Sequence, residues 1–203
     1  NRAERIADYW VFGGIFRPVY LQATSVSHIE SVAIDAKANG SFYMDVFVQS
    51  ATTKNHVEAQ IQTLDGKKVG ELLTADVQAE DQKYILKGTI TNPKLWNPEE
   101  PNLYQVVVQL KKGKTVTHQY TQKFGFRTVE LRASDGIYVN GTKIMFRGVC
   151  RHTFWPETGR TSSKALAIED VNLIKDMNMN AVRMSHYPPD QYFLDVCDSL
   201  GLF

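Results

Sequence analysis

The sequence contains little cysteine, no excess of either charge and no long apolar run. Its two cysteines, Cys150 and Cys197, lack the close spacing of a zinc or redox motif, so no metal is predicted. We expect two buried thiols near a shared core, with a disulfide between them as the open alternative. The 23 basic and 22 acidic residues leave a formal net charge of +1, which favours neither a nucleic-acid partner nor a membrane surface.

The two ends of the chain lack the features of a natural start and finish. The first residues, Asn-Arg-Ala-Glu-Arg, contain no initiator Met and no signal peptide, and the last three are the apolar Gly201-Leu202-Phe203. No apolar run reaches the length of a membrane span. We interpret the chain as an excised fragment. Its compartment therefore stays open, with a bacterial periplasmic or secreted location favoured over the cytoplasm.

Short segments of alternating apolar and polar residues fill the region from about Ser25 to Arg127. Alternation with a period of two predicts strands that turn one face to a core. Turn pairs such as Asp65-Gly66 and Lys112-Gly113 separate them, and the whole is typical of an immunoglobulin-like β-sandwich without a disulfide. The expected core positions are Phe42, Met44, Val46, Val48, Val57, Ala59, Ile61, Tyr104, Val106, Val108 and Leu110.

The segments on either side of this region follow different patterns. Residues 9–21 are aromatic and β-branched with a Gly-Gly break, which predicts a strand. After Arg127 we expect a hairpin, formed by 137–139 and 142–146 around Asn140-Gly141. A strand over 147–152, a helix over 164–178 capped by Ser162 or Ser163, a strand over 180–185 and a helix opened by Pro188-Pro189 follow it. Strand, helix, strand, helix is the beginning of a parallel α/β arrangement.

Polar side chains gather just past the ends of the last two predicted strands. They are Arg151 and His152 after the first strand, and Arg183, Ser185, His186 and Tyr187 along and after the second. In (β/α)₈ barrels the reactive groups lie at these carboxyl ends, because the loops there converge on one mouth. Arg and His donate hydrogen bonds in fixed directions and Tyr offers a flat face, which together suit a sugar ring. Taken alone, the pattern fits structural histidines at His152 and His186 better than a site.

Four ordered stretches resemble family 2 of the glycoside hydrolases, with the β-galactosidase branch the most similar. The resemblance covers nearly the whole chain. Its departures are Met184, where a small residue is commoner, and Cys150, where the branch more often has Asn, which puts the exact sugar in doubt. The stretches are Asp8 to Val19, Leu95 to Tyr104, Phe124 to Arg127 with Arg147 to His152, and Asn180 to Pro188 with Phe193 to Phe203.

This resemblance implies a mainly β chain, with an immunoglobulin-like sandwich followed by the truncated start of a (β/α)₈ TIM barrel. Residues 1–24 would be the end of an N-terminal jelly roll, 25–128 the sandwich, and 129–203 the first two β/α units of the barrel. It also implies self-association, since two barrel strands without neighbours leave unpaired edges and apolar helix faces.

The resemblance further implies that His152, Arg183 and His186 line a sugar subsite. The histidines would contact sugar hydroxyls, and Arg183 would orient hydroxyls or the neighbouring nucleophilic carboxylate. The family draws both catalytic glutamates from positions downstream of its His-Tyr-Pro motif, the first in an Asn-Glu pair, and no such pair occurs in this sequence. We therefore expect no catalytic residue in this chain, no cofactor, and a carbohydrate partner such as a β-galactoside.

Two hypotheses of other classes stay open. The first is a non-catalytic β-sandwich module that binds carbohydrate or protein, and the second is a purely structural spacer over 25–128. Single residues also have plain interpretations: Glu157 is a solvated loop carboxylate and Trp96 a plug at the end of the sandwich. We expect His28, His56 and His118 to be surface or half-buried strand residues.

Overall fold

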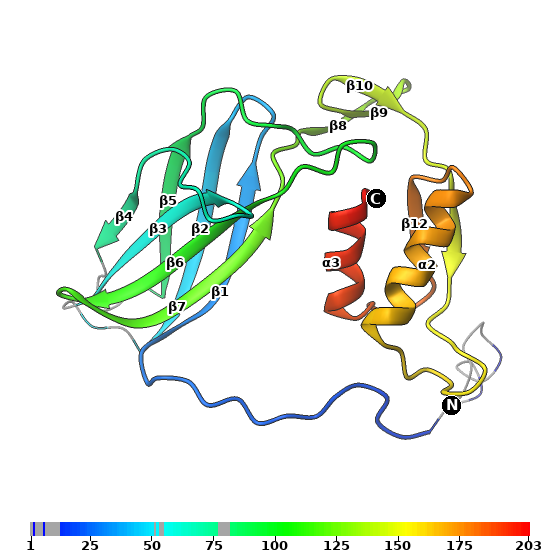
Figure 1. Cartoon of the computed structure of the whole chain (residues 1–203), viewed down its shortest axis with the longest axis horizontal. Coiled ribbons are helices and arrows are strands. Elements are labelled where there is room, and N and C mark those ends of the chain that lie inside the picture. The colour runs from blue at the N-terminus through cyan, green and yellow to red at the C-terminus, as the bar shows by residue number, and fades with distance from the viewer. Residues whose placement is uncertain (1, 3–5, 7–12, 51, 53–54, 77–81) are drawn as a thin grey trace. The chain divides into compact units, whose positions relative to one another are not determined.

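The computed structural model describes residues 2, 6, 13–50, 52, 55–76 and 82–203, and seven of its strands form a β-sandwich (Figure 1). One antiparallel sheet has the order β1-β2-β5, and the other has the order β4-β3-β6-β7. The prediction of a mainly β chain with an immunoglobulin-like sandwich is confirmed. The strands are β1 (His28–Ala36), β2 (Ser41–Gln49), β3 (Asn55–Thr63), β4 (Leu73–Asp76), β5 (Lys83–Thr89), β6 (Tyr104–Lys112) and β7 (Thr115–Phe124).

The sandwich core consists of the side chains at alternate positions of its strands. All eleven residues that the alternation assigned to the core are buried, from Phe42 on β2 to Leu110 on β6. Phe124 and Phe126 pack with Tyr104 at ring-centroid distances of 5.3 to 6.1 Å and close one end of the core. His28, His56 and His118 are half-buried strand residues, as expected.

A small antiparallel sheet of order β10-β9-β8 follows the sandwich. Its strands are β8 (Val129–Arg132), β9 (Gly136–Val139) and β10 (Thr142–Ile144). The predicted hairpin turn is present: Asn140 and Gly141 both have the positive φ that this turn type requires. Asn140 also accepts from the Thr128 amide and donates to the Trp96 carbonyl, at 2.9 and 3.0 Å. Trp96 itself is only 1% exposed, which confirms its expected role as a plug.

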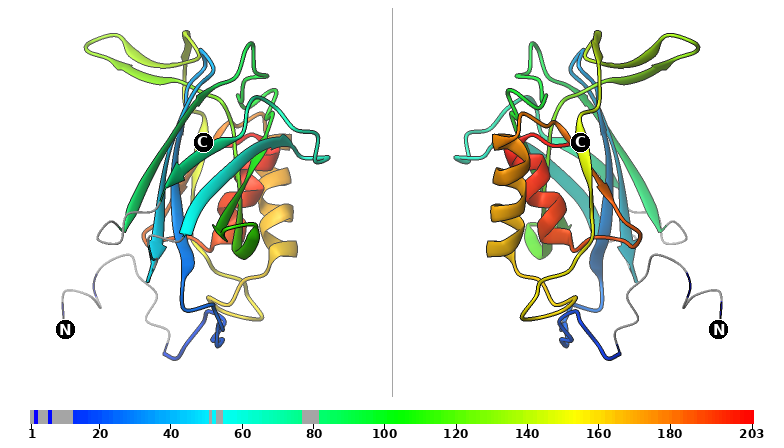
Figure 2. Two further views of the ribbon diagram at one scale, coloured as in Figure 1. Left: turned by 90° about the vertical axis from the view of Figure 1, so that its left-hand side faces the viewer. Right: turned by 90° about the vertical axis from the view of Figure 1, so that its right-hand side faces the viewer.

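The C-terminal segment forms a parallel strand pair and two helices. β11 (Gly148–Arg151) pairs in parallel with β12 (Ala181–Met184), and α2 (Lys164–Asp176) connects them. α3 (Gln191–Leu200) follows β12 and lies beside α2 (Figure 2). Ser163 caps α2 by accepting from the Leu166 amide, and Gly201 ends α3 in the left-handed conformation.

One apolar cluster joins these two helices to the strand pair. Its buried members are Ala167, Val171, Ile174, Phe193, Val196, Cys197 and Leu202, and Val149 and Val182 pack against them from the strands. By internal contacts, Gln22–Ile144 is one compact unit, and Met145–Phe203 forms a second unit with the segment up to Leu21. No helix in the described ranges is long and apolar enough to cross a membrane.

The predicted strand over residues 9–21 is wrong for residues 13–21, which are irregular. Residues 9–12 lie outside the described part of the chain. A strand requires a hydrogen-bonded neighbour, and residues 13–21 pair with none of the described strands. Ile15 and Val19 are 82% and 80% exposed, so the β-branched residues that suggested a strand pack on no sheet here.

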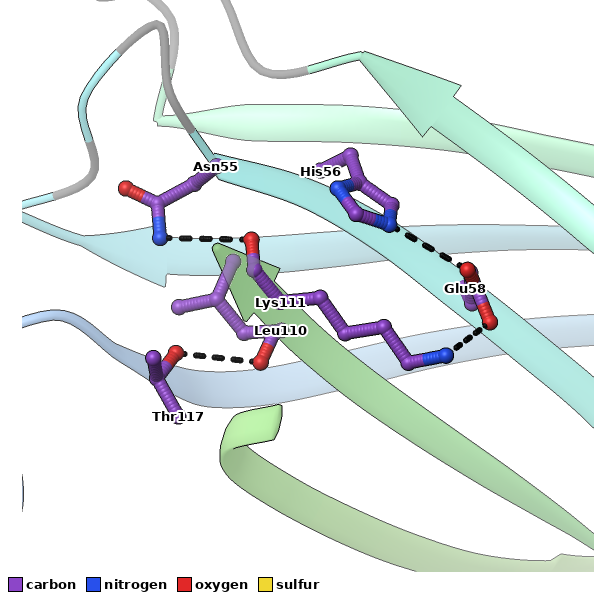
Figure 3. A network of polar contacts seen from close by, with 6 residues as sticks. All are labelled: Asn55, His56, Glu58, Leu110, Lys111 and Thr117. Atoms are coloured by element: carbon purple, nitrogen blue, oxygen red, sulfur yellow. Dashed lines mark hydrogen bonds and ion pairs between the residues drawn. The ribbon is translucent and has the colours of Figure 1, made fainter. Parts of the chain in front are cut away.

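A network of hydrogen bonds and ion pairs surrounds the C-terminal end of β6 (Figure 3). The register between β6 and β7 shifts at Leu110, where the Thr117 hydroxyl donates to the Leu110 carbonyl at 3.0 Å. On β3, Glu58 accepts from both His56 and Lys111, and these three side chains lie on one face of the sheet. The hydrogen bond from the Lys111 ammonium lowers the pKa of Glu58. Burial of the carboxylate raises it by less, so the pKa stays below its ordinary value of 4.5.

Replacing Glu58 by Gln should lower the free energy of unfolding at pH 7 by about 1 kcal/mol, because the Lys111 ammonium loses its charged partner. A carboxylate whose pKa is lower in the folded than in the unfolded state stabilises the folded protein at pH values above its unfolded pKa. This stabilisation is lost as the pH falls through the folded pKa. The difference between the two proteins should therefore shrink between pH 5 and pH 3. Urea unfolding followed by circular dichroism measures it. Glu30→Gln, at an exposed position of β1, is the matched control, and an equal loss in that variant would contradict the assignment.

Candidate functional site

The parallel pair β11 and β12 presents two faces of different character. In its register Val149 lies beside Val182, and Cys150 lies beside Arg183. Successive side chains of a strand point to opposite faces, so the two valines share one face while Cys150 and Arg183 share the other. The valines pack on the helices, and Cys150 and Arg183 are exposed. The pair therefore separates a packing face from an open face.

Arg151 belongs to the packing face, although the sequence pattern grouped it with the candidate site. Its guanidinium forms a salt bridge with Asp170 of α2, with nitrogen-to-oxygen distances of 2.6 and 2.7 Å. It also lies 4.2 Å from the ring centroid of Phe193 on α3 and donates to Thr153 at 3.2 Å. Its side chain is only 11% exposed, so Arg151 ties the strand to both helices.

Cys150, Arg183 and Ser185 form a polar group on the open face. The Arg183 guanidinium donates to the Ser185 hydroxyl at 2.9 Å and to the Cys150 sulfur at 3.7 Å. These two donors, Arg183 before Ser185, hold the pKa of Cys150 below its ordinary value of 9.0. A hollow of about 480 Å³ lies along the strand pair, and it is lined by Phe146, Gly148, Val149, Cys150, Ala181, Val182, Arg183 and Phe203.

The expectation of two buried thiols is correct for Cys197 and wrong for Cys150. Cys197 lies in the apolar cluster between the helices, and burial raises its pKa to about 12. Cys150 is exposed, because the strand alternation turns Val149 toward the helices and Cys150 away from them. Both thiols are free, so the alternative of a disulfide is also wrong.

His152 and His186 meet just past the carboxyl ends of the two strands. Their ring centroids are 5.3 Å apart and their planes are almost perpendicular, at 89°. The ring of Tyr187 lies 6.3 Å from that of His152. The backbone N–H of Ser185, a residue only 2% exposed, donates to the Arg151 carbonyl at 2.9 Å and keeps the end of β12 beside β11. Arg183, on β12 two residues before Ser185, donates to the Ser185 hydroxyl.

Sequence reasoning missed the residues that surround this histidine pair. The Arg160 guanidinium lies 3.9 Å from the Tyr187 ring centroid and 4.0 Å from that of Phe16. Phe16 is far away in the sequence, and no spacing rule links it to Arg160. Only the residue types could have pointed to this contact: Arg160 follows Gly159 in a loop, and Phe16 is an aromatic residue in a segment with no strand partner.

Comparison with known proteins identifies the family. The model of "Glycosyl hydrolases family 2" matches residues 27–127, and that of "Glycosyl hydrolases family 2, TIM barrel domain" matches residues 129–203. The chain belongs to family 2 of the glycosyl hydrolases. This family membership confirms the predicted fold class, a sandwich followed by the beginning of a TIM barrel domain.

Similar proteins include enzymes of two specificities. The chain is 32% identical over 200 residues to a β-galactosidase of Halalkalibacterium halodurans and 36% identical over 212 residues to one of Pseudoalteromonas haloplanktis; each match covers 97% of the chain and 20% of the relative. The structure of Bifidobacterium dentium β-glucuronidase complexed with coumarin-3-O-glucuronide is similar at a TM-score of 0.79 and 29% identity, over 87% of this chain and 30% of that one. The chain thus spans about a fifth of the curated relatives' length.

Within family 2, the open face of β11 and β12 offers hydrogen-bond donors and no paired carboxylates. Arg183 contributes a planar guanidinium, and the two imidazoles can each donate or accept. Glu157 is exposed in the loop between β11 and α2, as expected of a solvated carboxylate. Among the residues that the structure describes, no group of three or more His, Cys, Asp or Glu side chains is arranged to hold a metal ion. These groups can donate hydrogen bonds to a polar ligand and, through the imidazoles, accept them.

The two cysteines should differ sharply in reactivity. At pH 7.5 iodoacetamide should modify Cys150 at least about tenfold faster than Cys197, because thiolate content and access control the rate. Arg183→Ala should slow the modification of Cys150, since removing the guanidinium raises its pKa. Mass spectrometry of tryptic peptides gives both rates, and Arg147→Ala, at an exposed position before β11, is the control. Equal rates for the two cysteines would contradict the structure.

Proposed function

We propose that the chain is part of a retaining β-glycosidase of the β-galactosidase type, acting in carbohydrate metabolism. It supplies one wall of the sugar subsite through His152, Arg183 and His186. In this proposal residues 1–24 end an N-terminal jelly roll, 25–128 form a sandwich that mainly holds neighbouring domains, and 129–203 open the catalytic barrel. The observation that carries the proposal is the perpendicular pair of imidazoles, 5.3 Å apart, at the carboxyl ends of two parallel strands.

The chemistry of these groups supports a sugar ligand. A pyranose presents hydroxyl groups that both donate and accept, in directions fixed by the ring. Two imidazoles at right angles reach hydroxyls that point in different directions, and the exposed guanidinium of Arg183 adds further donors. These groups bind and orient the ring. They perform no proton transfer in the bond-breaking step.

In a retaining glycosidase two carboxyl groups, about 5 Å apart, carry out the reaction. One carboxylate attacks the anomeric carbon while the other carboxylic acid protonates the departing oxygen, and water then releases the sugar from the first. We assign both glutamates to a part of the protein outside these 203 residues. The isolated chain should therefore not hydrolyse a nitrophenyl β-galactoside.

The rival proposal, a binding module built on the sandwich, requires an exposed aromatic platform. Trp96 is only 1% exposed. The exposed large apolar side chains of the described sandwich positions are all aliphatic: Val26, Leu64, Leu72, Ile85 and Val116. A sugar stacks on a flat ring rather than on an aliphatic side chain, so this surface favours the glycosidase proposal over the rival.

Sugar binding should be visible in the imidazole signals of the isolated chain. Titration with galactose or glucuronate should shift the NMR signals of His152 and His186, with a dissociation constant on the order of millimolar because the site is only partly built. The sandwich contains a matched control, since His28 and His118 also form an edge-on pair, with centroids 5.9 Å apart, and should not shift. Arg183→Ala should weaken binding about tenfold or more.

The outcomes of this titration separate the proposals. Saturable shifts confined to His152 and His186 support the sugar subsite, and the sugar that binds more tightly indicates whether the substrate is a galactoside or a glucuronide. Shifts confined to sandwich residues would support the rival module. No shift with either sugar up to about 100 mM would overturn the assignment of the site, since that is well above the expected dissociation constant.

The isolated chain should also self-associate through its C-terminal unit. α2 and α3 carry exposed apolar side chains, Ile168, Leu173 and Leu194, which are 39%, 58% and 40% exposed. Such side chains favour contact with another copy. Sedimentation velocity between 5 and 200 μM should show a rising average mass, and Leu173→Lys should reduce the rise. A clean monomer at the highest of these concentrations would contradict the expectation.

A further inference from the structure

The N-terminal segment packs on the loops that carry the histidine pair. Residues 13–21 form no strand or helix, and Phe16 is their one half-buried residue. An isolated irregular segment has no hydrogen-bonded neighbour to hold it in place. The side chains of Phe16 and its neighbour Arg17 therefore account for the position of this segment, and both contact the unit that contains β11 and β12.

Phe16 is joined to Tyr187 through Arg160. The guanidinium of Arg160 lies between the two rings, 4.0 Å from the centroid of Phe16 and 3.9 Å from that of Tyr187. A planar cation between two aromatic faces attracts both. Arg160 follows a tight turn in which Trp155 and Gly159 exchange backbone hydrogen bonds of 2.7 and 2.8 Å. The loop after β11, the loop after β12 and the N-terminal segment thus meet at one guanidinium.

Arg17 holds the far end of the loop after β12. Its guanidinium donates to the Pro188 carbonyl and lies 3.3 Å from the Asp190 carboxylate. Asp190 occupies the N-cap position of α3 but makes no capping bond through its side chain. Its carboxylate instead accepts from the Tyr192 hydroxyl at 3.0 Å, and it is only 15% exposed. Asp190 therefore serves the contact with Arg17 at the expense of the helix cap.

His186 directly precedes these two attachments in the sequence. Tyr187 follows it directly, and the Tyr187 ring stands 6.3 Å from that of His152, which in turn lies 5.3 Å from His186. A continuous series of ring and guanidinium contacts leads from Phe16 through Arg160 and Tyr187 to the histidine pair. A rotation of Tyr187 would disturb the neighbouring imidazole, because packed rings cannot move independently.

We propose that Phe16, Arg17 and Arg160 form a clamp that positions the loop 185–190 and so sets the orientation of His186 and His152. They are positioning residues, since none of them belongs to the sugar subsite itself. The part of this inference that concerns sugar affinity rests on the proposed function. The part that concerns the orientation of the histidines does not.

The first test requires no sugar. In NMR spectra of the full 203-residue chain labelled at its histidine rings, Phe16→Ala and Arg160→Ala should shift or broaden the signals of His152 and His186, while those of His28 and His118 stay in place. Arg132→Ala is the matched control, because Arg132 also stacks on a tyrosine, 3.6 Å from the Tyr138 ring centroid, but in the sandwich unit. Unchanged signals of His152 and His186 in both clamp variants would overturn the clamp.

The second test measures galactose and glucuronate affinity. Phe16→Ala and Arg160→Ala should weaken binding about three- to tenfold. Phe16→Tyr keeps the ring and should restore the affinity, and Arg160→Lys should restore it only in part, because an ammonium lacks the planar face that stacks on both rings. Affinity unchanged in Phe16→Ala would overturn the positioning role. If Arg160→Ala unfolds its unit, Phe16→Ala decides, because residues 13–21 contribute no helix or strand.

Together the two tests distinguish a failure of the proposed function from a failure of the clamp. Wild-type chain that binds neither sugar contradicts the proposed function, while the first test still confirms or overturns the clamp through the imidazole signals alone. Wild-type binding with no response to the clamp variants contradicts the clamp and leaves the proposed function supported.

Discussion

The parallel pairing of β11 with β12 is the constraint on which the rest of the site depends. Its register sets Cys150 beside Arg183 and Val149 beside Val182, so that polar and apolar side chains leave the sheet on opposite faces. Arg151 fixes this arrangement from the packing face, through its salt bridge to Asp170 on α2 and its contact with Phe193 on α3. A slip of one residue would turn the valines outward and bury Arg183 among the helices.

The sandwich plays a different part, because its chemistry is that of a stable frame. Its strands bury one continuous apolar core, and its outer polar groups pair among themselves, as Glu58 does with His56 and Lys111 (Figure 3). Its histidines pair within the sandwich too. A frame of this kind buries its own core and pairs its own polar groups.

The sequence was sufficient for the periodic elements. Alternation located the sandwich core residue by residue. Ser162 or Ser163 marked the start of α2 and Asn140-Gly141 marked a turn, since their chemistry acts over a few residues. It failed where long-range packing decides. The composition of residues 13–21 predicts a strand only if a neighbour exists, and the burial of Cys150 depends on which face the helices cover. The stack of Phe16, Arg160 and Tyr187 joins three separate segments, so no local pattern contains it.

The central claim is that adjacent residues of β12 serve opposite purposes, Val182 for packing and Arg183 for the sugar. Urea unfolding of the chain in the presence and absence of saturating galactose tests it directly, because it gives stability and ligand stabilisation together. Val182→Ala should lower the unfolding free energy by about 1 kcal/mol while galactose still stabilises the protein, and Arg183→Ala should leave stability unchanged while galactose no longer stabilises it. The account would be contradicted if Arg183→Ala destabilised the chain as much as Val182→Ala and still responded to galactose.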